Sequence, residues 1–458
     1  MSRYSFIMVA SLIASPRVAA ADQDPAARPQ TIEAAPAGEK EQPSRPLRGQ
    51  PAAAPSGPSG AAAAAEPPVQ TFTPEDVTPP MGPSGQTPPA PATTQEAAGF
   101  APLTMDEIPV TSANARVTVN MFGDAGFRLQ TRFKPAFILG PLDLLLTGQF
   151  ANLMAMAEAN LETDPETGAV GIDLERMFVR WRSERFVIDA GRTHTELGYW
   201  NSAFHHGRWL QLPIERPHIV EFEDSGGLLP VHWVGVTGRL RALVGERQLD
   251  VIGSVGNGRG NIIDDVRVTD DTNDWKAVLL KVEARGFGAR DLYLGVSGIF
   301  DRIAPLPALS PTGGAIRPTL PDVTIGEVIA NAYVAYRGPE LTIIAEAYDV
   351  HHQANGQKWN TFDPFLLLGY RIAQWVPFVL GEARMGDVAS DPFFFPVPGA
   401  PLDTTYPRWG RFVEGTGGLR WDLNTWSAVK FEYRATRPLP KDSTSLVQRF
   451  MIDWTFGL

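Results

Sequence analysis

From about residue 114 to the end of the chain, apolar side chains alternate with polar or small ones in segments of roughly ten residues. In segment 427–434, Val429 and Phe431 fall on one face of a strand, and Lys430 and Glu432 fall on the other. This period of two predicts β-strands with one apolar and one ionisable face. Such strands fit a soluble sandwich, whose apolar faces form a core, or a transmembrane barrel, whose apolar faces meet lipid.

The lengths of the links between the predicted strands distinguish between these two folds. Sixteen strands are expected, at 116–131, 141–150, 152–162, 171–182, 185–193, 231–242, 248–256, 274–285, 290–300, 324–337, 340–352, 361–372, 374–385, 409–422, 425–436 and 445–458. Short links at 183–184, 243–247, 286–289, 338–339 and 423–424 alternate with long ones at 193–230, 257–273, 301–323, 353–360, 386–408 and 438–444. Transmembrane barrels alternate short turns with long loops, whereas a sandwich has no reason to do so. We therefore predict an all-β fold, a sixteen-stranded antiparallel transmembrane β-barrel over residues 113–458.

One link, residues 193–230, is long, charged and aromatic, and it lacks the alternation of a strand. It joins the fifth and sixth predicted strands, which makes it the third loop at the long-loop end of the barrel, loop 3. A loop of this length inside a compact domain is usually functional. We expect loop 3 to fold into the mouth of the barrel.

Tryptophans mark one level of the predicted barrel. Five of them lie within a few residues of a short turn or of the C-terminus: Trp181, Trp375, Trp421, Trp426 and Trp454. Amphipathic indole rings favour the interface between lipid and water. Their positions therefore favour a membrane barrel with its short turns at one interface.

The first 112 residues differ from the rest of the chain. Arg3 precedes a short apolar run, and Ala19, Ala20 and Ala21 offer a small-residue cleavage site. Residues 1–21 are therefore predicted to be a secretory signal peptide. Residues 22–112 are rich in alanine and proline and have few large apolar side chains, which predicts a disordered linker.

Composition removes several classes of function. The 458-residue chain has no cysteine, which excludes disulfides and thiolate metal sites. Its formal net charge of −11 comes from a mixed set of basic and acidic residues. That balance argues against a dedicated nucleic-acid binder. Nothing in the sequence calls for a cofactor.

Strand number, the position of loop 3 and the alternating C-terminal strand resemble the sixteen-stranded bacterial porins over residues 114–458. The pattern is most similar to the phosphate-selective and related proteobacterial porins. The resemblance implies passive diffusion of small hydrophilic solutes or ions and a homotrimer in contact with outer-membrane lipid of a Gram-negative cell. An even number of strands brings both termini to the periplasmic side, so we expect the linker in the periplasm. No ladder of Lys or Arg matches a phosphate-selective pore, so the anion preference is not carried over.

Ionisable side chains at the constriction are expected to set selectivity, because a barrel of this size encloses an aqueous channel. Loop 3 offers Glu196, His205, His206, Arg208, Glu215, Arg216, Glu221, Glu223 and Asp224. From the wall, alternation points inward Arg176, Arg180, Arg182, Lys281, Glu283, Glu346, Glu382, Arg384, Arg420, Lys430, Glu432 and Arg434. The alternative is that these charges pair with one another and hold the strands and the loop in place.

Histidines gather in or beside loop 3, at positions 194, 205, 206, 218 and 232. With nearby carboxylates, His194, His205, His206 and His218 are weak candidates for a metal site, since imidazole is a common ligand. The adjacent pair His205 and His206 lacks the spacing of helical zinc motifs. Hydrogen bonds from these rings to the barrel wall are the favoured interpretation, and a pH-gated constriction is a milder version of it. A metal-binding or plugged barrel with an adhesion or structural role remains the alternative.

A lipid hydrolase requires a serine, a histidine and an orienting polar group. Ser202 precedes His205 by three residues, but no G-x-S-x-G motif is present. The sequence therefore predicts a protein that is not an enzyme.

Overall fold

A computed structural model describes residues 115–131, 133–163, 170–204, 207–222, 227–260, 271, 273–305, 323–394, 410–439 and 446–458. The predicted signal peptide and linker lie outside this described part. So do four of the candidate constriction residues, His205, His206, Glu223 and Asp224. Among the described residues, no helix is both long and apolar enough to cross a membrane.

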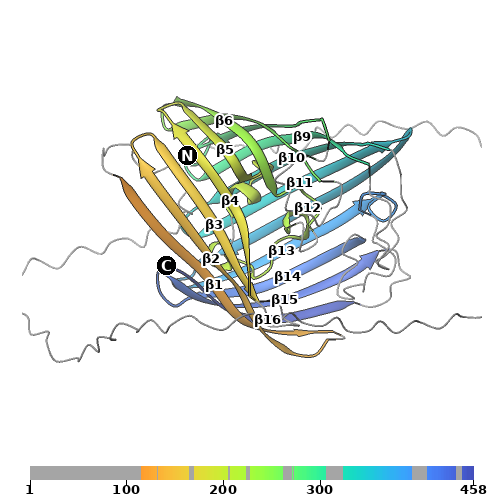
Figure 1. Ribbon diagram of the computed structural model, residues 1–458. Coiled ribbons are helices and arrows are strands. Elements are labelled where there is room, and N and C mark those ends of the chain that lie inside the picture. Colours follow the sequence, from red (N-terminus) through yellow and green to blue (C-terminus); the bar gives the residue numbers. More distant parts are fainter. Residues whose placement is uncertain are drawn as a thin grey trace, which may run out of the picture. The chain divides into compact units, whose positions relative to one another are not determined.

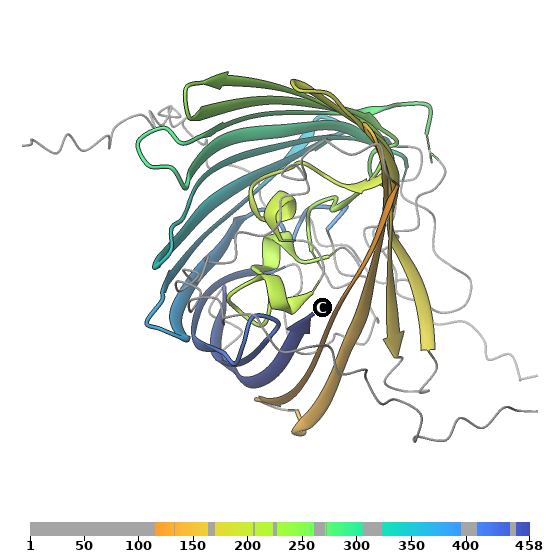
Figure 2. The ribbon, with the colours of Figure 1, turned by 90° about the vertical axis from the view of Figure 1, so that its left-hand side faces the viewer.

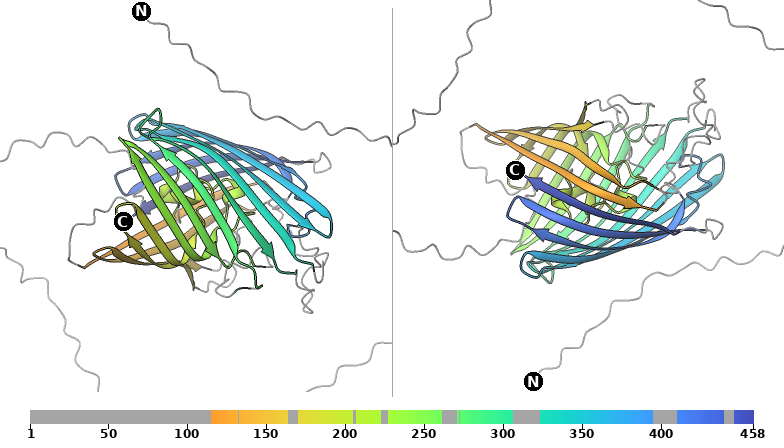
Figure 3. Two further views of the ribbon diagram at one scale, coloured as in Figure 1. Left: turned by 90° about the horizontal axis from the view of Figure 1, so that it is seen from above. Right: turned by 90° about the horizontal axis from the view of Figure 1, so that it is seen from below.

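The described residues form a closed antiparallel barrel of sixteen strands, which confirms the predicted fold (Figure 1). Each strand pairs with its neighbours in sequence, and β1 closes the barrel by pairing with β16. The strands run aslant around the barrel (Figure 3). Their bounds are β1 Arg116–Gln130, β2 Ala136–Phe150, β3 Leu153–Thr163, β4 Val170–Arg182, β5 Phe186–His194, β6 His232–Val244, β7 Arg247–Gly256, β8 Ala277–Arg285, β9 Leu292–Ile303, β10 Ile325–Arg337, β11 Leu341–Ala354, β12 Gln357–Tyr370, β13 Trp375–Gly386, β14 Arg411–Asp422, β15 Ser427–Leu439 and β16 Val447–Gly457. Closure leaves no open sheet edge.

The link predicted at 353–360 is a tight hairpin instead of a long loop. β11 and β12 pair as far as Ala354 and Gln357, and the two turn residues Asn355 and Gly356 have φ angles of 49° and 75°. Asn-Gly favours a two-residue turn with positive φ at both positions. The polar flanking residues suggested a loop, but this local turn preference extends both strands.

Strand β2 also begins earlier than predicted. The strand was predicted at 141–150, yet the ladder between β1 and β2 continues to Ala136, with a register shift between Gly123 and Ala125. A Cβ atom on Gly140 would lie 2.1 Å from a carboxylate oxygen of Asp124. Glycine is therefore required at this close approach, and it does not end the strand.

The outside of the barrel is apolar. Along β8, the side chains of Val278, Leu280 and Val282 are exposed, whereas those of Leu279 and Lys281 are buried. Each of the sixteen described strands carries at least one exposed large hydrophobic side chain. Apolar surface on every strand is typical of a barrel surrounded by lipid.

Two of the predicted interfacial tryptophans stack on each other. Trp375 begins β13 and pairs in register with Trp421 of β14, and their ring centroids lie 4.9 Å apart. The indole rings of Trp181, Trp426 and Trp454 are among the exposed large side chains near the same short-turn end.

The described residues of loop 3, which joins β5 to β6, are 195–204, 207–222 and 227–231, and they lie inside the barrel (Figure 2). They contain one short helix and two 3₁₀ turns, namely α1 Trp200–Ala203, η1 Arg208–Leu210 and η2 His218–Val220. The neck of the loop is closed by a hydrogen bond of 2.8 Å from the Thr195 N–H to the Val231 carbonyl.

An apolar core joins loop 3 to the barrel wall. Trp200 and Ile219 of the loop are fully buried and belong to one hydrophobic cluster with Ile329 and Phe365 of the wall. The Trp200 and Phe365 rings meet edge to face, with centroids 5.6 Å apart. Burying one large apolar side chain is worth about 1.5–3 kcal/mol, so this cluster fixes the loop inside the barrel.

Candidate functional site

Two basic side chains of the wall hold loop 3 by its main chain. The Lys430 ammonium on β15 donates to the carbonyls of Gln211 at 2.8 Å, Pro213 at 3.2 Å and Arg208. The Arg420 guanidinium on β14 donates to the Gln211 carbonyl at 3.2 Å and to the Trp209 carbonyl at 2.7 Å. Because short loops and turns leave carbonyls without partners, these cations replace water as donors.

Acidic side chains hold the loop's N–H groups in the same way. Glu346 accepts from the N–H groups of Trp200, at 2.9 Å, and Tyr199. Glu382 accepts from the Ile219 N–H at 3.1 Å, and Glu432 accepts from the Ile214 N–H at 2.6 Å. These wall carboxylates are therefore bound to loop 3 and do not face open water.

Other candidate residues pair with neighbouring groups of the wall or of loop 3. Arg384 forms a buried salt bridge of 2.6 Å with Asp363, and Arg216 donates within loop 3 to the Val220 carbonyl at 2.7 Å. Arg208 lies 2.7 Å from Asp124 and 3.4 Å from Asp453, on the wall. The alternative stated from the sequence, that charges hold strands and loop together, describes these residues.

Glu215 joins loop 3 to two wall arginines. Its carboxylate forms a salt bridge with Arg449 and lies 3.7 Å from the Arg434 Nε atom. Burial alone would raise the pKa of Glu215, but Arg449 and Arg434 outweigh it and lower this pKa to about 2.

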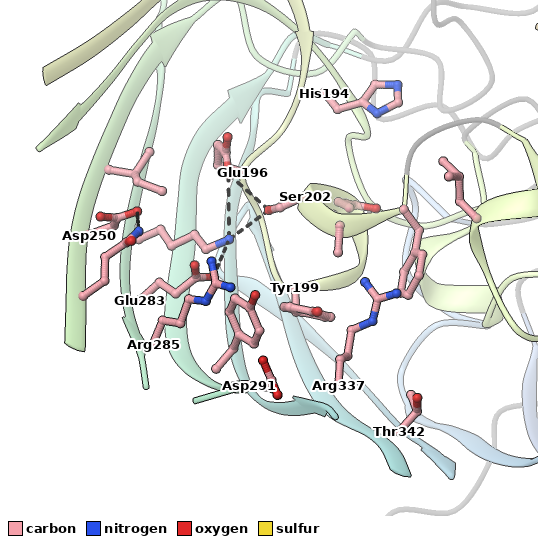
Figure 4. A pocket seen from close by; sticks show the side chains of 18 of the residues that line it. His194, Glu196, Tyr199, Ser202, Asp250, Glu283, Arg285, Asp291, Arg337 and Thr342 are labelled. Atoms are coloured by element: carbon pink, nitrogen blue, oxygen red, sulfur yellow. Dashed lines mark hydrogen bonds and ion pairs between the residues drawn. The ribbon is translucent and has the colours of Figure 1, made fainter. Parts of the chain in front are cut away.

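A cavity of about 580 Å³ lies between loop 3 and the wall (Figure 4). Glu196 and Tyr199 line it from the loop, and Lys281 lines it from β8. It extends to Asp291 and Glu340, which belong to the β8–β9 and β10–β11 turns. The cavity therefore reaches the short-turn end of the barrel.

Lys281 is the closest link between loop and wall in this cavity. Its ammonium donates to the Gly198 carbonyl and to the Ser202 hydroxyl, each at 2.8 Å. The same atom lies 3.8 Å from the Glu196 carboxylate and 3.6 Å from the Glu283 carboxylate. Figure 4 shows Glu196, Ser202 and Glu283 around this ammonium. The group forms a charged wall on one side of the cavity.

The cavity is lined by only part of the predicted constriction set. The predicted constriction residues that line it are Arg176, Arg180, Glu196, Lys281, Glu283 and Arg420, and His194, a candidate metal ligand, lines it too. Those described that do not line it are Arg182, Arg208, Glu215, Arg216, Glu221, Glu346, Glu382, Arg384, Lys430, Glu432 and Arg434.

Sequence reasoning missed several arginines of this cavity. Arg239 and Arg241 lie on β6 and point to the face opposite Leu240, so the alternation within 231–242 could have found them. Arg239 lies 2.9 Å from Glu196, and Arg241 lies 3.2 Å from Asp250. Their partners could not be inferred, because loop 3 has to be placed first.

One histidine ties loop 3 to the wall as the favoured interpretation expects. The His218 Nε2 atom lies 3.0 Å from the Glu414 carboxylate on β14. Burial lowers the pKa of His218, but the charges of Glu414 and Glu382 outweigh it and shift this pKa upward. A second pair forms between His232 and Glu175, at 2.6 Å.

Ser202, the serine considered for lipid hydrolysis, lies inside the barrel. Its hydroxyl donates to Glu196 at 3.1 Å and to the Gly198 carbonyl at 3.0 Å, and it accepts from Lys281. The arrangement shows a serine used to hold loop 3, away from the lipid-facing surface.

The sequence matches no protein-family model and no curated protein. Solved structures do match. The anion-selective porin from Comamonas acidovorans has a TM-score of 0.50 at 9% identity, with 75% of this chain and 100% of that chain covered. The outer-membrane channel DcaP of Acinetobacter baumannii has a TM-score of 0.49 at 10% identity, with 76% and 99% covered.

A loop-deleted form of OmpT, an outer-membrane protein of Vibrio cholerae, has a TM-score of 0.47 at 12% identity, with 76% and 100% covered. Likeness at this identity concerns the fold, and the similarity to phosphate-selective porins stays a prediction. With its closed barrel of sixteen antiparallel strands, the described chain has the fold of the outer-membrane porins.

Proposed function

We propose that this protein is a passive, non-enzymatic channel of the outer membrane for small hydrophilic solutes or ions. The observation that carries the proposal is the combination of an apolar outer surface on all sixteen described strands with a charged cavity beside loop 3. Solutes pass where side chains are wetted, and the protein excludes lipid from that path.

We place the constriction in the cavity beside loop 3. Glu196, Arg239, Lys281 and Glu283 line it, and they form two ion pairs, Glu196 with Arg239 and Lys281 with Glu283. Opposed charges across a narrow passage create a transverse field that favours polar over apolar solutes.

The cavity is more basic than acidic. Ten arginine or lysine side chains but only six aspartates or glutamates are among the described residues that line it. A surplus of fixed positive charge attracts anions, so the proposed channel conducts anions better than cations. The Comamonas acidovorans porin, whose fold is similar, is anion-selective, which agrees with this proposal.

The remaining predictions about the cell belong to the same proposal. Residues 1–21 direct export, residues 22–112 form a linker in the periplasm, and the barrel assembles as a homotrimer. The short-turn end with its tryptophans then faces the periplasm.

Planar-bilayer recording tests the proposed function. Purified protein should give discrete ohmic current steps, and a salt gradient should give a reversal potential of the sign expected for anions. The double variant Arg239→Gln with Arg241→Gln should shift this potential towards cations. The matched variant Lys358→Gln, at an exposed position beside the β11–β12 hairpin, should leave it unchanged.

Absence of current steps from folded protein would favour the alternative, a barrel plugged by loop 3 with a structural or adhesion role. Lysolipid produced from phospholipid by the purified barrel would contradict the non-enzymatic part of the proposal.

A further inference from the structure

Two groups of described side chains bring three potential metal ligands together. In each group, the imidazole nitrogens and carboxylate oxygens lie within 4.8 Å of one another. One group is Glu175, His194 and His232, and the other is His218, Glu382 and Glu414.

The group around His218 is a loop anchor rather than a metal site. The Arg434 guanidinium lies 3.0 Å from Glu414 and 3.5 Å from the His218 Nε2 atom. Glu382 is already bound to the Ile219 N–H. The Arg434 charge at this distance repels a divalent cation, and it already pairs with Glu414, one of the three potential ligands.

The group around His232 is built differently. His194 ends β5 and His232 begins β6, and the two residues are directly opposite in the antiparallel register. Their ring centroids lie 5.2 Å apart, and the His232 Nε2 atom lies 2.6 Å from the Glu175 carboxylate. Glu175 falls at the register shift between β3 and β4, where it is an extra residue in the ladder. Bulges of this kind often redirect a side chain at functional sites.

Neighbouring groups orient these three ligands. The Asn160 amide donates to the other Glu175 carboxylate oxygen at 2.7 Å. The Phe222 ring stacks on His232 with an angle of 26° between planes, and its centroid lies 6.2 Å from that of His194. Orienting contacts of this kind accompany metal ligands and tune their affinity.

Two arginines lie near these ligands and contact the main chain or the wall. The Arg192 Nε atom donates to the Glu175 main-chain carbonyl at 2.9 Å, and Arg176 forms a salt bridge with Glu158. His194 also lines the cavity, which gives solvent and ions a route to the site.

We propose that Glu175, His194 and His232 bind a divalent transition-metal ion of the zinc class. Two imidazoles and one carboxylate form a donor set that zinc and its first-row neighbours take, with water in the fourth position. The ion joins β4, β5 and β6 at the two ends of loop 3. Metal binding therefore fastens the neck of the loop.

Zinc titration of the untagged, full-length barrel in detergent tests this site. The protein is stripped with a chelator and then competes with a chromophoric chelator for Zn²⁺. About one zinc ion per chain should bind. His194→Ala and Glu175→Gln should each weaken zinc affinity at least about 100-fold, because loss of a ligand lowers the affinity more than loss of an orienting partner does. Zinc should also raise the unfolding temperature of the wild-type chain only.

His194→Ala is the primary variant because it leaves the hydrogen bond between His232 and Glu175 intact. Cobalt(II) bound in place of zinc should give visible absorption bands that disappear in this variant. His351 lies on β11 and is hydrogen-bonded to Asn360, away from the proposed ligands. The control variant His351→Ala should bind zinc as the wild type does. Circular dichroism and gel mobility report whether each variant is folded.

Three results would overturn the proposal: no zinc retained by the wild-type barrel, undiminished binding in folded His194→Ala and Glu175→Gln, or binding lost in His218→Ala but kept in His194→Ala. None of these readouts requires ion conduction, so the outcome is independent of the proposed channel function.

Discussion

Lys430 illustrates how single residues act in this barrel. Alternation along β15 places its side chain inside, and there its ammonium is fully buried against three carbonyls of loop 3. A hydrogen bond to a charged group contributes about 1.5–3 kcal/mol, and several of them fix one segment. The charge therefore positions the loop and does not face the channel.

The variant Lys430→Met should loosen loop 3 without opening the barrel. We expect larger and noisier current steps in planar bilayers, because the carbonyls of Arg208 and Pro213 lose the ammonium donor. Lys358→Met is the control, since Lys358 is exposed. Identical steps and noise in both variants would contradict the role given to Lys430.

Glu215 makes the attachment of loop 3 dependent on pH. Its pKa falls from an ordinary value of 4.5 to about 2, so its stabilising effect is complete above pH 4.5 and is lost as pH falls towards 2. Glu215→Gln should remove this effect at neutral pH. Current noise should therefore rise between pH 4.5 and 2 in the wild type, whereas the variant should be noisy throughout this range.

Glu184→Gln is the matched control for that experiment, because Glu184 is exposed in the short turn between β4 and β5. A wild-type noise level that stays constant down to pH 2 would argue against the Glu215 attachment.

At this scale the sequence predicted which way side chains point, but not what they contact. Period-two alternation correctly placed Lys281, Glu346 and Glu432 inside. Their hydrogen-bond partners depend on where loop 3 crosses the lumen, which no local pattern encodes. The cavity arginine Arg239 could have been found from the same alternation.

At the scale of secondary-structure elements, the sequence predicted the strands more accurately than the links between them. Apolar alternation reports the medium on each side of a strand, so all sixteen strands were predicted. The β11–β12 hairpin was missed because its Asn355 and Gly356 turn is a stronger signal than the polar residues beside it. The helical turns of loop 3 were not predicted, because wall contacts fix them.

A matched pair of substitutions on the outer surface tests how deep each strand position lies in the lipid bilayer. Leu280 lies in the middle of β8, and Leu243 lies near the short β6–β7 turn; both side chains are exposed, at 57% and 68%. Leu280→Arg should cost about 2–4 kcal/mol and Leu243→Arg about 0–1 kcal/mol, because the cost falls from the bilayer midplane to the interface. Urea unfolding in lipid vesicles measures both values.

Equal and near-zero costs would mean that both leucines face water, since surface substitutions usually change stability by less than about 0.5 kcal/mol. That outcome would contradict the membrane placement of the outer surface.

For the whole molecule, the account requires lipid outside and water inside. Loop 3 and the wall share one apolar core, and the described cavity lies between the loop and the wall. Its basic lining then acts on solutes at short range. The Debye length, beyond which salt screens a charge, is about 10 Å at 0.1 M and becomes shorter at higher ionic strength. The anion preference should therefore weaken as ionic strength rises.

Two neighbouring positions on β8 test this arrangement most directly, because the chain has no cysteine of its own. Val282 is exposed on the outer surface, and Glu283 lines the cavity. In vesicles, a charged, water-soluble thiol reagent should modify Glu283→Cys rapidly and leave Val282→Cys largely unreacted, whereas a lipid-soluble maleimide should show the opposite order. Equal or reversed reactivity towards the water-soluble reagent would contradict the account.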